Sequence, residues 1–188
     1  MLPNRSISTG VGMPDRYVAL LRGINVGKAK RIAMADLRDA VGSLGHTEVK
    51  TLLNSGNVVF TATDKPTEKA LYEAIKNTTG VSSDVILVTG RQLDQIVDQN
   101  PLTDVMTDPS RLMVMFFTDA HDRSRLRKLV DDSWDPEQLA VGRQAAYFWC
   151  PDGIAKSPLM EVVGEQKFDG TVTTRNWRTV TKLSQLLH

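Results

Sequence analysis

The residues best suited to chemistry lie in the segment RGINVGKAKR, residues 22–31. A buried apolar strand is predicted over residues 17–22, so that it runs into this segment, and the apolar spacing after it predicts a helix. Cationic side chains and free backbone N–H groups at the end of a strand bind anions, and no acidic residue interrupts them here. The segment therefore predicts an anion site. Its predicted contacts are Arg22, Asn25, Lys28 and Lys30.

The glycine spacing of this segment distinguishes it from a nucleotide-binding P-loop. GINVGK has three residues between its glycines, one fewer than that motif, and Ala29 stands where the motif has Ser or Thr. Because the hydroxyl that coordinates magnesium is missing, the sequence argues against a P-loop nucleoside triphosphatase. The structural alternative to an anion site is a solvated turn with strain-relieving glycines and solubilising lysines.

A second basic segment, TTRNWRTV at residues 173–180, precedes the last predicted helix. Asn176 is a predicted N-cap, so Arg178 falls in the first helical turn, where the positive end of the helix dipole favours an anion. Arg175 is predicted to point into the same region, and packing of the two halves could bring both basic segments to one cleft. In the alternative interpretation Trp177 begins the core face of the helix and Asn176 is only a cap.

Other catalytic or metal-binding arrangements find little support in the sequence. The three histidines, His46, His121 and His188, are too dispersed to form a triad or a metal cluster, and we predict no metal and no cofactor. The single cysteine, Cys150, excludes a disulfide framework and is predicted to be dispensable. Ser157 precedes Pro158, which is typical of a helix N-cap rather than of a nucleophile.

Composition narrows the class of protein. The chain has 188 residues, 41% of them hydrophobic, which is enough for one good core or two small ones. A net charge of +1 argues against a protein that coats nucleic acid, although a local basic patch fits the composition. One cysteine fits the reducing cytoplasm, and the longest apolar runs, such as residues 112–117, are too short to span a bilayer. We therefore predict a cytoplasmic protein without a membrane anchor.

The predicted elements follow the order βαββαβ twice. The expected organisation is an α+β fold with a disordered extension at residues 1–15, a ferredoxin-like half at 16–90, a connecting helix and loop at 91–110, and a second ferredoxin-like half at 111–188. The first strands of both halves are continuously apolar, which indicates that both sheet faces are covered. The simplest arrangement packs the two halves against each other.

Four blocks resemble successive signatures of the bacterial family called domain of unknown function 1697. They are LLRGINVGKAKRIAMADLR, TLLNSGNVVF, YFWCPDGIAKSPL and TTRNWRTVTKL, within about residues 16–187. The resemblance implies a compact α+β protein of two related subdomains and no established activity. The chain departs from the family at Lys28-Ala29, where a second glycine and a polar residue are frequent, and at Cys150.

The function that the sequence favours is binding of a phosphate-bearing small molecule or a nucleic acid segment. One alternative is an enzyme acting on a nucleotide-like substrate by electrostatic stabilisation, and another is a protein-interaction module. In each case we expect the basic residues named above, Arg175 and Arg178 included, to contact the partner.

Overall fold

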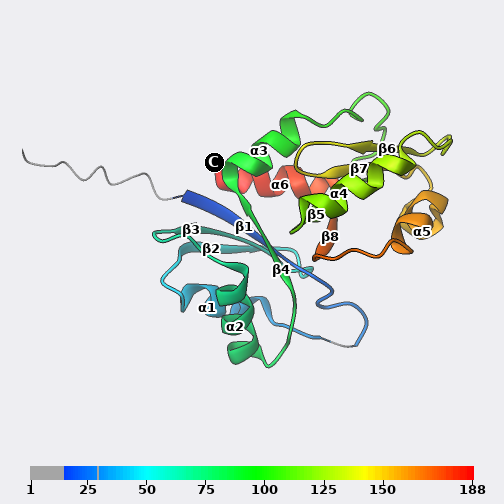
Figure 1. Cartoon of the computed structure of the whole chain (residues 1–188). Coiled ribbons are helices and arrows are strands. Elements are labelled where there is room, and N and C mark those ends of the chain that lie inside the picture. The colour runs from blue at the N-terminus through cyan, green and yellow to red at the C-terminus, as the bar shows by residue number, and fades with distance from the viewer. Residues whose placement is uncertain (1–14, 29) are drawn as a thin grey trace, which may run out of the picture.

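Two four-stranded antiparallel sheets form the framework of the protein in a computed structural model that describes residues 15–28 and 30–188 (Figure 1). The strands are β1 Asp15–Leu21, β2 Thr47–Leu52, β3 Asn57–Ala62, β4 Val85–Thr89, β5 Leu112–Phe117, β6 Gln138–Val141, β7 Ala146–Trp149 and β8 Val172–Asn176. The helices are α1 Met34–Gly42, α2 Glu68–Thr79, α3 Gly90–Asp98, α4 Ala120–Arg125, α5 Pro158–Gly164 and α6 Trp177–Leu187, with short 3₁₀ turns at Leu126–Leu129 and Ile154–Lys156.

Both sheets place the first strand of their half at the centre. The strand orders are β2-β3-β1-β4 and β6-β7-β5-β8, so β1 and β5 each pair with two neighbours. Both of these central strands have a continuous apolar sequence, because a central strand covered on both faces has no solvent-facing side. The predicted α+β class, the two halves and the central position of their first strands are confirmed.

Local sequence signals account for the helix ends. The Thr67 side chain accepts a hydrogen bond from the N–H of Ala70 at the start of α2, and Gly80 ends that helix in the left-handed conformation, with φ of 73°. Ser157 caps α5 before Pro158, as predicted. Asn176 caps α6 by accepting a hydrogen bond of 2.9 Å from the N–H of Thr179, which also confirms the prediction.

The core has three parts, and its central part contains two helices. The outer face of the first sheet packs on α1 and α2, and the outer face of the second sheet packs on α5 and the 3₁₀ turn Leu126–Leu129. Between the inner faces lie α3 and α6, which pack on each other and on residues of both sheets such as Val18 and Val114. The halves therefore do pack together, but helices rather than sheet-to-sheet contact cover the inner faces.

The buried aromatic residues of β7 belong to this central core. Tyr147 is buried and its hydroxyl donates a hydrogen bond of 2.8 Å to the carbonyl of Ile96 in α3. Trp149 is also buried in the central core. These rings thus serve packing between the halves.

The start of β1 lies against the last turn of α6. Arg16 at the start of β1 donates a hydrogen bond of 2.6 Å to the carbonyl of Leu187 in α6. The predicted extension, residues 1–15, lies outside the described residues except for Asp15, which belongs to β1. No helix within the described ranges is long and apolar enough to cross a membrane.

Candidate functional site

The loop after β1 has a defined shape that Asn25 maintains. Its side-chain Nδ2 donates hydrogen bonds to the carbonyls of Ile32 and Asn54, at 3.0 and 2.7 Å, and its Oδ1 accepts one of 2.9 Å from the N–H of Ile32. Asn25 itself has a positive φ of 55°, which asparagine tolerates better than most residues. The predicted ligand contact Asn25 therefore has its amide group engaged in bracing the loop.

Arg22, in contrast, presents its side chain to a space between the two halves. Its backbone N–H donates to the carbonyl of Asp84 at 2.9 Å, and its carbonyl accepts a bond of 2.9 Å from the Ser83 hydroxyl. The residue is exposed and, among the described residues, its guanidinium forms no ion pair. Because its backbone is anchored and its guanidinium forms no ion pair with a described residue, Arg22 is positioned to bind a ligand.

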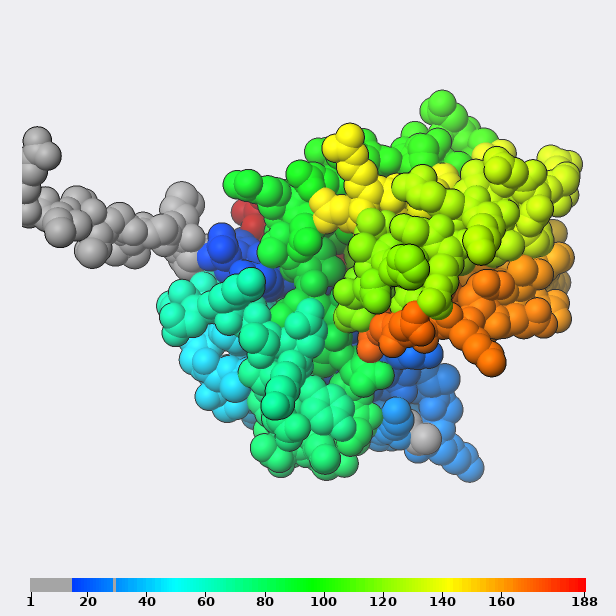
Figure 2. Space-filling view, in the orientation of Figure 1, coloured from blue at the N-terminus to red at the C-terminus, as the bar shows by residue number. Residues whose placement is uncertain are grey.

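The space that Arg22 borders is a cavity of about 250 Å³ whose remaining wall comes from the second half. Its apolar lining includes Met115, Met160, Val163, Phe168 and Val172. In the space-filling view the orange surface that contains the segment around residue 170 lies next to the blue surface that follows β1 (Figure 2). A cation beside an apolar concavity suits a ligand with an anionic group and an apolar part. We call this space the Arg22 pocket.

The second-half wall of this pocket, residues 168–172, is held in place by a buried carboxylate. Asp122 accepts hydrogen bonds from the N–H groups of Asp169 and Gly170, at 3.0 and 2.7 Å, and pairs with Arg125 at 3.3 Å. Burial acts to raise the pKa of Asp122, but the two N–H groups and the cation outweigh it and the pKa is lowered. Asp122 is therefore ionised at neutral pH.

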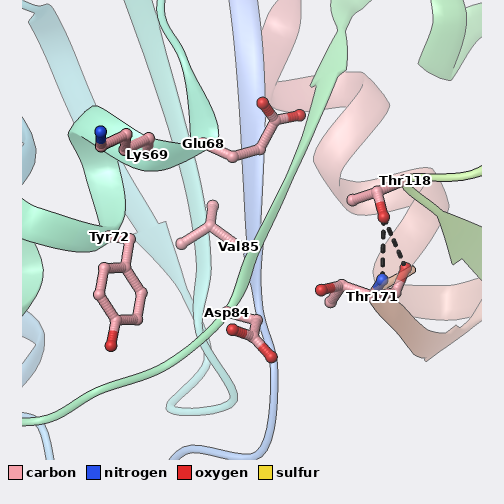
Figure 3. A pocket seen from close by; sticks show the side chains of 7 residues that line it. All are labelled: Glu68, Lys69, Tyr72, Asp84, Val85, Thr118 and Thr171. Atoms are coloured by element: carbon pink, nitrogen blue, oxygen red, sulfur yellow. Dashed lines mark hydrogen bonds between the residues drawn. The ribbon is translucent and has the colours of Figure 1, made fainter. Parts of the chain in front are cut away.

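A second, more open cavity of about 560 Å³ adjoins the Arg22 pocket. It is lined by Glu68, Lys69 and Tyr72 of α2, by Asp84 and Val85 at the start of β4, and by Thr118 and Thr171 of the other half (Figure 3). The N–H of Thr171 donates to the Thr118 hydroxyl at 2.9 Å, and the N–H of Thr118 donates to the carbonyl of Thr171 at 3.0 Å. We call this space the polar cavity.

Arg175 is placed beside the basic loop but does not face a ligand site. The residue is 8% exposed, and its guanidinium donates to the Asn57 side chain at 2.6 Å and to the Leu21 carbonyl at 2.7 Å. Further bonds of 2.8 to 3.4 Å reach Thr173, Thr174, Ser55 and Gly56. Burial lowers the pKa of Arg175 to about 10, so it remains a cation at neutral pH. Its predicted orientation toward the start of α6 was wrong, because carbonyl groups of the first half engage its donors.

The remaining predicted contacts are spread over the surface. Lys28 and Lys30 are exposed on the loop after β1. Arg178 is exposed at the start of α6, where it pairs with Asp108 at 3.5 Å, and no hydrogen bond or ion pair within the described part of the chain links it to that loop. The structure thus brings Arg175 to the base of the loop through Leu21, while Arg178 contacts the segment before β5.

Asp122 and Phe168 are among the residues of the site that were absent from the sequence prediction. Asp122 has no motif around it, and its role depends on a segment nearly fifty positions later in the chain, with the bond to Gly170 spanning 48 positions. Phe168 had no periodic pattern to mark it as a pocket residue. The sequence DGT at 169–171 signals a tight turn, which is the one local feature that could have drawn attention to this wall.

The surroundings of Cys150 and Ser157 are not those of a nucleophile, and no metal-binding cluster is found among the described residues. Burial raises the pKa of the Cys150 thiol to about 11, although a hydrogen bond with Ser157 acts against this. The Ser157 hydroxyl accepts a hydrogen bond from the N–H of Met160 as a helix cap. Within residues 15–28 and 30–188 no group of three or more His, Cys, Asp or Glu side chains could hold a metal ion.

Comparisons with known proteins identify the family and leave the function unknown. No curated protein matches the chain. A solved structure of a conserved bacterial protein from Streptococcus pneumoniae is similar, with a TM-score of 0.72 and 25% sequence identity over 93% of this chain and 99% of that chain. A model of the family described as proteins of unknown function, DUF1697, matches residues 14–147. The chain belongs to the DUF1697 family of proteins of unknown function.

Proposed function

We propose that the protein binds a phosphate-bearing small molecule in the Arg22 pocket. The observation that carries this proposal is the free guanidinium of Arg22 at the border of a cavity lined mainly by apolar side chains. Phosphate pairs well with the planar donor groups of arginine, and the apolar wall would receive the organic part of the ligand. Lys28 and Lys30, on the same loop, would attract the anion from solution.

The buried charge of Arg175 adds to the attraction. Its guanidinium lies against the carbonyl of Leu21, the residue that precedes Arg22, and among the described residues it has only neutral hydrogen-bond acceptors. A buried cation without a carboxylate partner raises the electrostatic potential around it. An anion beside Arg22 would therefore interact favourably with both arginines, although only Arg22 is accessible to it.

The lining of the Arg22 pocket favours binding over catalysis. Its described residues include no His, Cys, Ser, Asp or Glu, so the lining of the pocket itself supplies neither a nucleophile nor a general base. A nucleic acid segment is the second candidate, because Lys28, Lys30 and Arg31 are all exposed on one loop and could contact successive phosphates. We also propose a cytoplasmic location, where the free thiol of Cys150 would stay reduced.

Ligand titrations on matched variants test this function. Phenyl phosphate and adenosine monophosphate should raise the thermal midpoint of the wild-type protein, because a ligand that binds only the folded form stabilises it. In Arg22→Gln the dissociation constant should rise about 10- to 100-fold, since a charged bidentate contact is lost. Lys28→Gln removes an equal charge from the same loop outside the pocket and should change affinity less than about threefold.

The two candidate ligand classes respond differently to salt. A short oligothymidylate bound through the loop should lose affinity steeply as salt rises, and should weaken about equally in the Lys28→Gln, Lys30→Gln and Arg22→Gln variants. Small phosphates bound in the pocket should depend mainly on Arg22. Equal affinity of wild type and Arg22→Gln for every phosphate compound would overturn the proposed pocket.

A further inference from the structure

The polar cavity and the Arg22 pocket are neighbouring cavities, each lined by residues of both halves. The segment 170–172 contributes to the walls of both cavities. Gly170 and Val172 line the Arg22 pocket, and Thr171 lines the polar cavity. On the opposite side, Asp84 lines the polar cavity while its carbonyl accepts the hydrogen bond from Arg22. A ligand group held by Arg22 would therefore have the polar cavity directly beside it.

The two cavities differ in chemistry. The polar cavity presents the carboxylates of Glu68 and Asp84, the single ammonium of Lys69, the phenol of Tyr72 and the hydroxyl of Thr171, so its acids outnumber its cation (Figure 3). Neither carboxylate forms an ion pair within the parts of the chain that the structure describes. Carboxylates accept hydrogen bonds from hydroxyl groups, as acidic residues do from ribose, and they repel phosphate. This cavity thus suits a hydroxyl-rich neutral group, and the phosphate belongs at Arg22.

The relative positions of these groups are set by the backbone. The backbone N–H of Arg22 donates a hydrogen bond of 2.9 Å to the backbone carbonyl of Asp84, which holds these two residues side by side. The bonds between Thr118 and Thr171 fix the opposite wall, as the dashed lines in Figure 3 show. Such preorganisation reduces the cost of ordering the site when a ligand binds.

From this arrangement we infer that the ligand is a sugar phosphate or nucleotide whose sugar hydroxyls occupy the polar cavity. Glu68 and Asp84 accept hydrogen bonds from the sugar, Arg22 pairs with the phosphate, and any base or other apolar substituent lies against Met160 and Phe168. This inference rests on the proposed function, because it assigns the phosphate to Arg22. It adds the class of the attached group and the residues that select it.

The test compares two phosphates that differ in their hydroxyl groups. Glucose 6-phosphate and phenyl phosphate are titrated by calorimetry into wild type, Glu68→Gln, Asp84→Asn and Arg22→Gln. Glu73→Gln is the matched control, because Glu73 is an exposed residue of α2 that does not line the cavity. Circular dichroism verifies that each variant is folded, and Glu68 and Asp84 are both exposed, so neither substitution removes a buried group.

The expected result is selective. Glu68→Gln and Asp84→Asn should each weaken glucose 6-phosphate about 5- to 20-fold and leave phenyl phosphate within about twofold, since only the sugar uses the carboxylates. If phenyl phosphate binds in an Arg22-dependent way but glucose 6-phosphate is insensitive to both acidic variants, the sugar assignment is wrong and the pocket stands. If neither phosphate binds wild type, or Arg22→Gln changes nothing, both the pocket and the sugar assignment are overturned.

Discussion

Arg175 of the second half donates a hydrogen bond of 2.6 Å from Nε to the side-chain oxygen of Asn57 in the first half. The same guanidinium reaches the carbonyl groups of Leu21, Ser55 and Gly56, so all of its cross-half contacts are made to neutral acceptors. Asn57 is itself buried and donates from Nδ2 to the carbonyl of Leu52. One side chain thus joins the ends of β1 and β3 to β8.

Replacing Arg175 should destabilise the protein strongly. Arg175→Met keeps much of the apolar stem but leaves the acceptors of Leu21 and Asn57 buried without donors, which should cost about 3–5 kcal/mol of unfolding free energy. Arg175→Lys should recover part of this loss, because the lysine ammonium restores one donor group but not the planar array of N–H donors of a guanidinium. Urea denaturation at pH 7 measures both.

The control for this prediction is the other arginine of the same segment. Arg178 has a side chain that is 58% exposed and pairs with Asp108 at 3.5 Å. Arg178→Met should change the unfolding free energy by less than about 0.5 kcal/mol. Equal effects of the two substitutions would contradict the structural role assigned to Arg175.

Gly56 should not tolerate a side chain. It has a φ of 83°, and a Cβ atom built on it would lie 2.7 Å from the Cβ of Leu21. Gly56→Ala should therefore cost more than about 2 kcal/mol, from backbone strain and from displacement of Leu21. At Gly164, the last residue of α5, no atom lies within 4 Å of such a Cβ, so Gly164→Ala should be neutral or stabilise by up to about 1 kcal/mol. Thermal and urea unfolding of both variants give the comparison.

Asp122→Asn should loosen the wall of the Arg22 pocket. The amide retains one acceptor but places N–H donors against the N–H groups of Asp169 or Gly170, which should cost about 2 kcal/mol. Because the folded-state pKa of Asp122 is lowered, its contribution is present above its unfolded pKa and is lost as pH falls through the folded value, below pH 3.8. Acid unfolding of wild type should therefore be steeper than that of Asp122→Asn. Asp131→Asn, an exposed substitution, serves as the control.

The Cys150 thiol should be unreactive and dispensable. Since burial raises its pKa to about 11, the folded thiol should not react with a disulfide reagent at pH 8 until urea unfolds the protein. Cys150→Ala should cost about 1 kcal/mol through lost packing. Rapid labelling of the folded protein would contradict this assignment.

The same pKa predicts how stability changes in alkali. Between pH 9.0, the ordinary pKa of the thiol, and about pH 11 the unfolded thiol loses its proton while the folded thiol keeps it, so stability falls as pH rises through this window. Wild type should therefore lose up to about 2 kcal/mol more than Cys150→Ala between pH 9 and pH 11. Urea midpoints at the two pH values test the difference.

Local signals were sufficient to predict the elements and their order. Ser157-Pro158 and Asn176-Trp177 marked helix starts, and Gly80 marked a helix end, because capping depends on residues a few positions apart. Periodicity could not reveal which surface covers an inner sheet face. The position of α3 and α6 between the sheets depends on how the halves pack, which no short window contains.

The site was harder to predict, because its residues are brought together over long distances in sequence. Arg175 contacts Leu21 across 154 positions, and only that contact shows that its donors are engaged. Arg22 was recognised from its place at the end of a strand, but its apolar pocket consists of residues from β5, α5 and β8 of the other half. Asn25 was named as a ligand contact, although its hydrogen bonds brace the loop.

The contact between Arg16 and Leu187 spans 171 positions and has a consequence for synthesis of the protein. On the ribosome, β1 and its neighbours emerge first, but α6, the last helix, packs against both β1 and β3. The part of the inner face of the first sheet that α6 covers therefore remains apolar and exposed until residues 177–187 have left the exit tunnel. During that interval this face is a natural binding surface for chaperones, and a stop codon before residue 177 would leave it exposed permanently.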